Sequence, residues 1–337
     1  MAAGSTCRAG LTRTRRSPQE PSDVHPGASV RSASAAADGT ALARLAGKRI
    51  LGYLSYRLKR KTVHDRSVLA ALVDDLLQHA PDHIAITGDL TNIALPEEFA
   101  STARWLRALR ASDALTVIPG NHDAYVAVPW QQSLERWSAF MSDRDAPIRD
   151  QHGFPFLRRR GEVALVGVST ACPTPWTHAT GRVGTKQLAR LAKLLEQLGA
   201  QSLFRVVLIH HPPIDGMISH RKRLTDQAAF CAMVEQVGAE LILHGHHHRF
   251  TLDELTTPAG KAPVIGVPSG SARHFAGHEH ASYHLCRLRP GTGCWRLEVE
   301  VRGVAETSDR FFTEHRFDLT IPNGRADKPL SSTMVAQ

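Results

Sequence analysis

Histidine, aspartate and asparagine residues recur in short motifs along this 337-residue chain. The motifs are Asp23-Val24-His25, Gly88-Asp89, Gly120-Asn121-His122-Asp123, His210-His211 and Gly245-His246-His247-His248. Ligands at positions i and i+2 of an extended segment lie on the same side of it and can reach one metal ion. Carboxylate, amide and imidazole groups suit divalent cations such as Mn²⁺, Fe²⁺ or Zn²⁺. The set therefore indicates a metal site assembled from distant parts of the chain.

Each motif taken alone has an ordinary structural interpretation. A histidine-rich tract is often a solvated loop, and Asp and Asn are favoured in turns for backbone reasons. A lone Asp-x-His is expected by chance in many proteins. Asp89 and Asn121 follow the apolar runs 83–87 and 115–118, and this placement favours the functional interpretation.

Hydrophobic periodicity indicates which elements position these motifs. Strands are expected over 83–87, 115–118, 162–168, 204–209 and 240–243, and helices over 45–61, 67–79, 96–110, 186–198 and 225–237. A further strand and a closing hairpin are expected over 263–268, 282–288 and 295–301. Strands that alternate with helices predict a parallel sheet, whose reactive residues gather at the carboxyl ends of the strands.

The amino-terminal segment departs from this pattern. Residues 1–40 are rich in Ser, Ala, Gly and Pro, which predicts a poorly ordered basic arm that carries the Asp23-His25 motif. The residues just before Asp23 are polar and include Pro18 and Pro21, whereas a buried strand would be apolar. The expected organisation is this arm, a domain over 41–303 and a carboxyl-terminal tail over 304–337.

The net charge of +9 is concentrated early in the chain, in the arm and between Lys48 and Arg66. Basic clusters attract phosphate in general, so the segment Lys48–Arg66 is a candidate contact for an anionic membrane surface. Ordinary solubility explains the cluster equally well, and nucleic-acid binding is not favoured. Because the chain has neither an apolar run of about 20 residues nor a CxxC motif, we expect a cytoplasmic protein without a disulfide framework.

In combination, the ordered motifs resemble those of the calcineurin-like metallophosphoesterases, over roughly residues 22–275. The forms GNHD, HHPP and GHxH are most similar to the bacterial branch of cyclic-nucleotide phosphodiesterases and related small phosphodiesterases. The resemblance implies an α/β protein with a four-layer α/β/β/α sandwich. It also implies two divalent metal ions (Mn, Fe, Zn or similar) as cofactors.

The resemblance implies a role for each residue of the motifs. One ion would be held by Asp23, His25, Asp89 and His248. The second ion would be held by Asn121, His210 and His246, with Asp89 bridging the two. His122 would stand near the leaving-group oxygen as the catalytic acid, and Asp123 would orient its imidazole ring. His211, His244 and His247 are expected to be neighbours of ligands.

The implied activity is hydrolysis of a small-molecule phosphodiester, of nucleotide or glycerophospholipid-related character, by hydroxide that two metal ions generate. One alternative within the same fold is a lipid pyrophosphatase or phosphatase that works at a membrane surface. Another is a catalytically impaired metal-binding protein, which would follow if Asp23 and His25 do not reach the site.

Overall fold

The computed structural model describes residues 24–26, 48–49, 65–143, 152–273, 279–306 and 308–323, with β1 described by its backbone. The helices are α2 (Arg66–Gln78), α3 (Pro96–Leu109), α4 (Thr185–Ala200) and α5 (Gln227–Val237), with short 3₁₀ helices at η4 (Ser112–Ala114), η5 (Trp130–Gln132) and η6 (Leu134–Phe140). Among the described residues, no helix combines the length and the apolar character needed to cross a bilayer.

The strands form three sheets. The first contains β1 (Val24–Pro26), β2 (His83–Ile86) and β3 (Leu115–Val117), paired in parallel. The second is the antiparallel sheet of β10 (Ser282–Pro290), β11 (Cys294–Val304) and β12 (Phe311–Pro322). The third, in the order β4-β5-β6-β7-β9-β8, consists of β4 (Phe156–Arg160), β5 (Val163–Gly167), β6 (Phe204–Ile209), β7 (Leu241–His244), β8 (Thr251–Thr257) and β9 (Gly260–Gly266).

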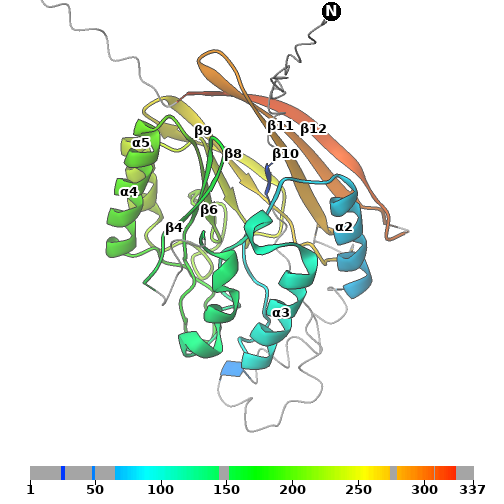
Figure 1. The fold of residues 1–337 in the computed structure, drawn as a ribbon. Helices are drawn as coiled ribbons and strands as arrows, with labels where there is room; N and C mark the ends of the chain where they lie inside the picture. Colours follow the sequence, from blue (N-terminus) through cyan, green and yellow to red (C-terminus); the bar gives the residue numbers. More distant parts are fainter. Residues whose placement is uncertain are drawn as a thin grey trace, which may run out of the picture.

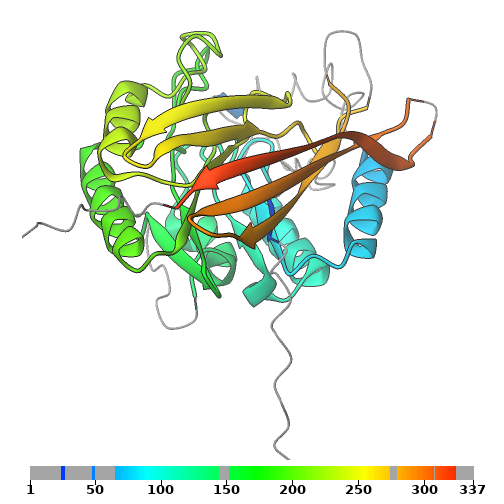
Figure 2. The same cartoon turned by 90° about the horizontal axis from the view of Figure 1, so that it is seen from above.

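Sheets lie in the middle of the molecule and helices lie outside them. Strand β1 runs beside both β2 and β10, so the first two sheets adjoin. Helices α4 and α5 cover one outer side, and α2 and α3 lie on the opposite side (Figures 1 and 2). This arrangement agrees with the expected mixed α/β fold in which two sheet layers are enclosed by helices.

Side-chain alternation along the strands explains this layering. In β6, Phe204, Val206 and Leu208 belong to the core that also holds residues of β2, β3, β10 and β11. Val207 and Ile209 of the same strand pack instead with the apolar faces of α4 and α5. Because successive strand residues point to opposite faces, this strand is apolar throughout and buries both faces.

The expected helices and strands from residue 67 to 301 are present, with ends shifted by a few residues. The carboxyl-terminal segment differs from its expected description as a tail. Strand β12 pairs with β11 along its length, so the antiparallel sheet extends beyond the expected boundary at residue 303. Alternating intermediate and exposed residues in β12 give it little apolar signal, because one side of this edge strand is open to solvent.

Strand β1 lies within the segment expected to be a poorly ordered arm. Its register places His25 opposite Ile84, five residues before Asp89 in the sequence. Strand β2 continues for only two residues beyond Ile84 before the loop that carries Asp89 begins. The backbone of His25 therefore lies beside the strand itself and not beside that loop. Asp23 lies outside the described residues.

A buried ion pair joins β6 to its neighbours. Arg205 Nη2 lies 2.6 Å from Glu240 Oε1, and each side chain is 4% exposed. The same guanidinium donates to the carbonyl oxygens of Leu195 in α4 and Val237 in α5. The Arg205 backbone N–H also donates to Glu240 Oε2. The pair thus fixes the ends of both outer helices to the central strands.

We predict that Glu240→Ala lowers the free energy of unfolding by about 3–5 kcal/mol, because it leaves the Arg205 charge buried without its partner. The control is Glu254→Ala, which removes an ion pair to Lys261 whose side chains are 54% and 68% exposed. That change should cost no more than about 0.5 kcal/mol. Urea denaturation of both variants measures the difference, and equal midpoints would contradict the assignment.

Candidate metal centre

Four loops that follow parallel strands bring the candidate ligands together. Asp89 follows β2, Asn121 follows β3, His210 follows β6 directly, and His246 follows β7. The first two strands belong to one sheet and the last two to another, so the site lies where the carboxyl edges of two sheets meet. A hydrogen bond of 2.6 Å from His210 Nδ1 to the Thr87 carbonyl oxygen joins the two edges.

His210, Asn121 and Asp89 present acceptor atoms to one point. Because Nδ1–H of His210 donates to a carbonyl, Nε2 carries the lone pair of the ring. That nitrogen lies 3.1 Å from Asn121 Oδ1 and 3.5 Å from Asp89 Oδ1. Three buried acceptor atoms at such distances repel one another unless a cation or a proton lies between them. Their chemistry fits a divalent metal ion.

His246 is a fourth candidate metal ligand. Its Nε2–H donates to the Lys222 carbonyl oxygen at 2.9 Å, and its buried Nδ1 has no hydrogen-bond partner in the part of the chain that the structure describes. The hydrogen bond at Nε2 fixes the ring and leaves Nδ1 to bind a metal ion, which is the usual arrangement for a metal-bound histidine. Burial, followed by the neighbouring His211, lowers the pKa of His246 well below its ordinary value and so keeps the ring neutral.

Strained backbone and close packing hold these loops in place. Asp89, His246 and His248 adopt positive φ angles of 62°, 61° and 60°. Side chains other than glycine rarely adopt this conformation, and it recurs at functional sites. A Cβ on Gly88 would lie 2.5 Å from the Gly120 nitrogen and 2.8 Å from His210 Nδ1, so glycine is required where the two edges approach.

The proposed second set of ligands is not assembled among the described residues. The register of β1 sets His25 beside Ile84 of β2, and its side chain is not described. His248 is half-buried, and its charge contributes to the lowered pKa of His246. Of the seven expected metal ligands, the structure therefore brings together Asp89, Asn121, His210 and His246, with His248 nearby.

His211 lies within the same histidine cluster, in which the nearest ring nitrogens of His210, His211 and His246 are within 4.8 Å of one another. Its Nε2–H donates to the Ala179 carbonyl oxygen at 3.1 Å, and its Nδ1 accepts from the Thr170 hydroxyl at 2.7 Å. Both nitrogens are occupied. His211 therefore packs beside the candidate ligands without a nitrogen left for a metal ion, as expected for a neighbour of the ligands.

Asp123 has a different function from the one expected. Its two carboxylate oxygens accept hydrogen bonds from the backbone N–H groups of Asp89, Thr91 and Gly120 at 2.8–2.9 Å and from the Thr91 hydroxyl at 3.0 Å. The expectation that Asp123 orients the His122 ring is thus replaced by a structural function: it ties the loop after β2 to the loop after β3. Burial and the nearby Asp89 carboxylate raise the pKa of Asp123 to about 7.

A backbone carbonyl orients His122 instead. Its Nδ1–H donates to the Asn92 carbonyl oxygen at 2.6 Å, which leaves Nε2 as the nitrogen available for proton transfer. The ring also stacks on Tyr125, with centroids 5.8 Å apart. The sequence offered no signal for the Asn92 contact, because any residue can provide a carbonyl group.

Two of the cations expected to face a membrane turn inward. Lys48 Nζ donates to the carbonyl and hydroxyl oxygens of Thr174 at 3.0 and 3.1 Å and lies 4.3 Å from the centroid of the Tyr125 ring. Arg49 donates to the carbonyl oxygens of Ile93 and Ala94. Both side chains thus support the loops beside His122. Residues 50–64 of the basic segment Lys48–Arg66 lie outside the described residues.

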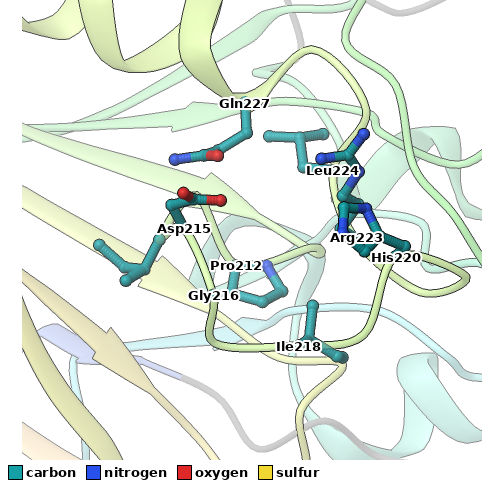
Figure 3. A pocket seen from close by; sticks show the side chains of 9 residues that line it. Pro212, Asp215, Gly216, Ile218, His220, Arg223, Leu224 and Gln227 are labelled. Atoms are coloured by element: carbon teal, nitrogen blue, oxygen red, sulfur yellow. The ribbon is translucent and has the colours of Figure 1, made fainter.

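The loop from Pro212 to Leu224 supplies the carbonyl group that fixes His246. It encloses a hollow of about 60 Å³, with Asp215 and Gln227 on one side and His220 and Arg223 on the other (Figure 3). Such a volume holds only a few water molecules and excludes a substrate. The loop therefore serves to place the Lys222 carbonyl group and is not itself the binding pocket.

We predict that Mn²⁺ raises the melting temperature of the protein, because an ion that binds only the folded state stabilises it by about 2.7 kcal/mol at a hundred times its Kd. His246→Ala should remove most of this shift, since it deletes the unpartnered Nδ1. His25→Ala should retain it, because the register of β1 pairs residue 25 with Ile84 inside β2 and not with the loop of Asp89. Equal losses in both variants would contradict that register. Thermal unfolding with and without the metal provides the measurement, and metal content by mass spectrometry checks it.

Comparisons with solved structures found proteins of similar fold. A similar fold occurs in a dimetal phosphatase from Danio rerio, at 15% identity over 77% of this chain and 90% of the other, with a TM-score of 0.53. Weaker likeness extends to a 5'-nucleotidase precursor from Thermus thermophilus (14% identity, 77% and 49% coverage, TM-score 0.40) and to a calcineurin-like phosphoesterase from Bacillus subtilis (9%, 90% and 91%, 0.38). A comparison with curated proteins found no match.

The model of one protein family matches residues 22–250, which is more than half of the chain and includes every motif described above. The match also spans the strands that carry Asp89, Asn121, His210 and His246. This chain therefore belongs to the calcineurin-like phosphoesterase family.

Proposed function

We propose that this chain hydrolyses a small-molecule phosphodiester, of nucleotide or glycerophospholipid-related character, in a metal-dependent reaction at the candidate metal centre. The observation that carries the proposal is the convergence of Asp89 Oδ1, Asn121 Oδ1 and His210 Nε2, with the oriented ring of His122 in the same loop as Asn121. Divalent cations bound there would neutralise phosphoryl oxygens and lower the pKa of a water molecule.

The side chains of the site would position the cation and the phosphoryl group and would supply a proton to the leaving oxygen. Asp89, Asn121, His210 and His246 would hold the cation, and through it the phosphoryl group. The hydrogen bond to Asn92 fixes the tautomer of His122 with its proton on Nδ1, so Nε2 can bind a proton and pass it to the oxygen that leaves. The backbone contacts of Asp123 keep the His122 loop and the Asp89 loop at a constant separation.

The structure offers no support for the membrane-surface alternative from Lys48 and Arg49, which are engaged inside the molecule. The alternative of an impaired metal-binding protein differs from the proposal in turnover. A hydrolytic assay therefore separates the two.

We predict that the metal-loaded protein hydrolyses bis(p-nitrophenyl) phosphate and that His122→Ala lowers kcat by about 10²–10⁴-fold, because the leaving oxygen loses its proton donor. The matched control is His315→Ala, an exposed histidine on β12 in the outer antiparallel sheet, whose removal should leave kcat unchanged. Release of p-nitrophenol at saturating substrate measures both. An unaltered kcat in His122→Ala would reject its assignment, and absence of turnover in the metal-loaded parent would favour the binding protein.

We also predict that a chelator abolishes hydrolysis and that Mn²⁺ restores it. The reason is that the acceptor atoms of Asp89, Asn121 and His210 cannot bind an anionic phosphoryl group by themselves. Dialysis against chelator followed by metal titration measures recovery, with unfolding monitored by circular dichroism. Full activity after the metal has been removed would contradict the proposed use of this centre.

A further inference from the structure

A cavity of about 690 Å³ lies beside the candidate metal centre. Apolar side chains make up much of its wall, including those of Val126, Val128, Trp130, Leu134 and Phe154. The volume falls within the range of about 300–1,000 Å³ that small-molecule pockets occupy. The cavity is therefore large enough for the organic part of a substrate.

The cavity and the metal centre share walls. Asp123 lines the cavity and directly follows His122. Ser169 and Ala171 line it as well, and the residue between them is Thr170, whose hydroxyl group donates to His211 Nδ1. Two separate segments thus face the cavity on one side and the metal centre on the other.

A third shared wall is provided by Gly181 and Arg182. A Cβ on Gly181 would lie 2.2 Å from His211 Nδ1, so this backbone packs directly on the histidine cluster. Arg182 is exposed, lines the cavity and donates its backbone N–H to the Thr170 carbonyl oxygen. The cavity therefore adjoins the metal centre, and its wall carries a cationic side chain that suits the negative charge of a phosphoryl group.

The polar groups of the wall argue against a nucleobase as the occupant. Gln187 accepts from the Ser169 N–H and donates to the carbonyl oxygens of Ser169 and Val183. The Ser133 hydroxyl donates to the carbonyl oxygen of Pro129. Recognition of a base edge needs donors and acceptors that are still available, and these side chains have already used theirs.

Trp130 lines the cavity without offering it a polar contact. The residue is 7% exposed, and its indole N–H is fully buried and has no hydrogen-bond partner among the described residues. A ligand in the cavity therefore does not reach this donor, and the wall stays apolar at Trp130.

We propose that this cavity binds an alkyl or acyl chain attached to the phosphoryl group, so that the preferred substrates are amphiphilic phosphoesters of the kind found in lipids. This inference rests on the proposed function, because it assumes that the phosphoryl group binds at the metal centre. The apolar wall provides selectivity through burial of methylene groups, and the metal centre and Arg182 provide attraction for the anionic head.

Alkylphosphonates test the proposal directly, because each has one anionic head and one chain and cannot be hydrolysed as an ester. Methyl-, butyl- and hexylphosphonate would be compared as competitive inhibitors of bis(p-nitrophenyl) phosphate hydrolysis. Each buried methylene can strengthen binding up to about fourfold, so we expect the Ki to fall at least about tenfold from methyl to hexyl. Ki values for methyl and hexyl that agree within about twofold would overturn the proposal.

Substitutions in the cavity wall test whether the dependence of Ki on chain length arises in this cavity. Val128→Asp places a charge in the apolar wall and should reduce the methyl-to-hexyl ratio of Ki to within about twofold, because a charge opposes burial of methylenes. Ala127→Trp fills part of the cavity from an exposed position and should lower the ratio without disturbing the core. The control Leu252→Asp changes an exposed apolar residue on β8, outside this cavity, and should keep the parental ratio. An unchanged ratio in both cavity variants would overturn the assignment.

Calorimetric binding of the same phosphonates to the Mn²⁺-loaded protein separates this inference from the proposed function. Chain-length-dependent binding without hydrolysis of any diester would reject the proposed activity while supporting the cavity assignment. Hydrolysis together with binding that ignores chain length would support the activity and reject the cavity assignment. Tighter binding of inosine or adenosine 5'-monophosphate than of hexylphosphonate would also reject the cavity assignment, because it would indicate that the cavity binds a nucleobase.

Discussion

The site depends on one buried carboxylate. Asp123 accepts hydrogen bonds from the backbone of the loop after β2 and from its own loop after β3, at Asp89, Thr91 and Gly120. In a dry interior such bonds are strong, and leaving any of these N–H groups unpaired would be costly. The carboxylate therefore fixes the separation between a candidate ligand and the candidate acid, although it touches neither of their reactive atoms.

The second constraint is the junction of two sheets. His210 ends a strand of the six-stranded sheet, and its Nδ1–H donates to the Thr87 carbonyl oxygen at the end of a strand in the other layer. The apolar core between the layers holds these edges in register, because residues such as Val206 and Leu208 pack there from the same strand. Positive φ angles at Asp89 and His246 show that the surrounding packing supports strained backbone at this edge.

The proposed activity and the proposed chain-binding cavity divide the substrate between two environments. The metal centre consists of buried acceptor atoms that suit a cation and, through it, a phosphoryl group. The neighbouring cavity offers apolar surface, with the polar side chains of Gln187 and Ser133 engaged in hydrogen bonds to the backbone. Specificity in such an arrangement comes from the apolar part, since any phosphoester can provide the anionic head.

The sequence by itself determined the order of elements and most of the candidate ligands. Apolar strands that end in Asp89, Asn121 and His210 can be read from local periodicity, because a buried parallel strand is apolar and its carboxyl end carries the functional loop. Contacts between distant backbone groups have no such signature. Only the tertiary structure decided that the Asn92 carbonyl group accepts from His122, that Asp123 bonds to backbone N–H groups and that Lys48 turns inward. It also decided the pairing of β12 and the register of β1. The reason is that each of these features depends on which segments meet in space.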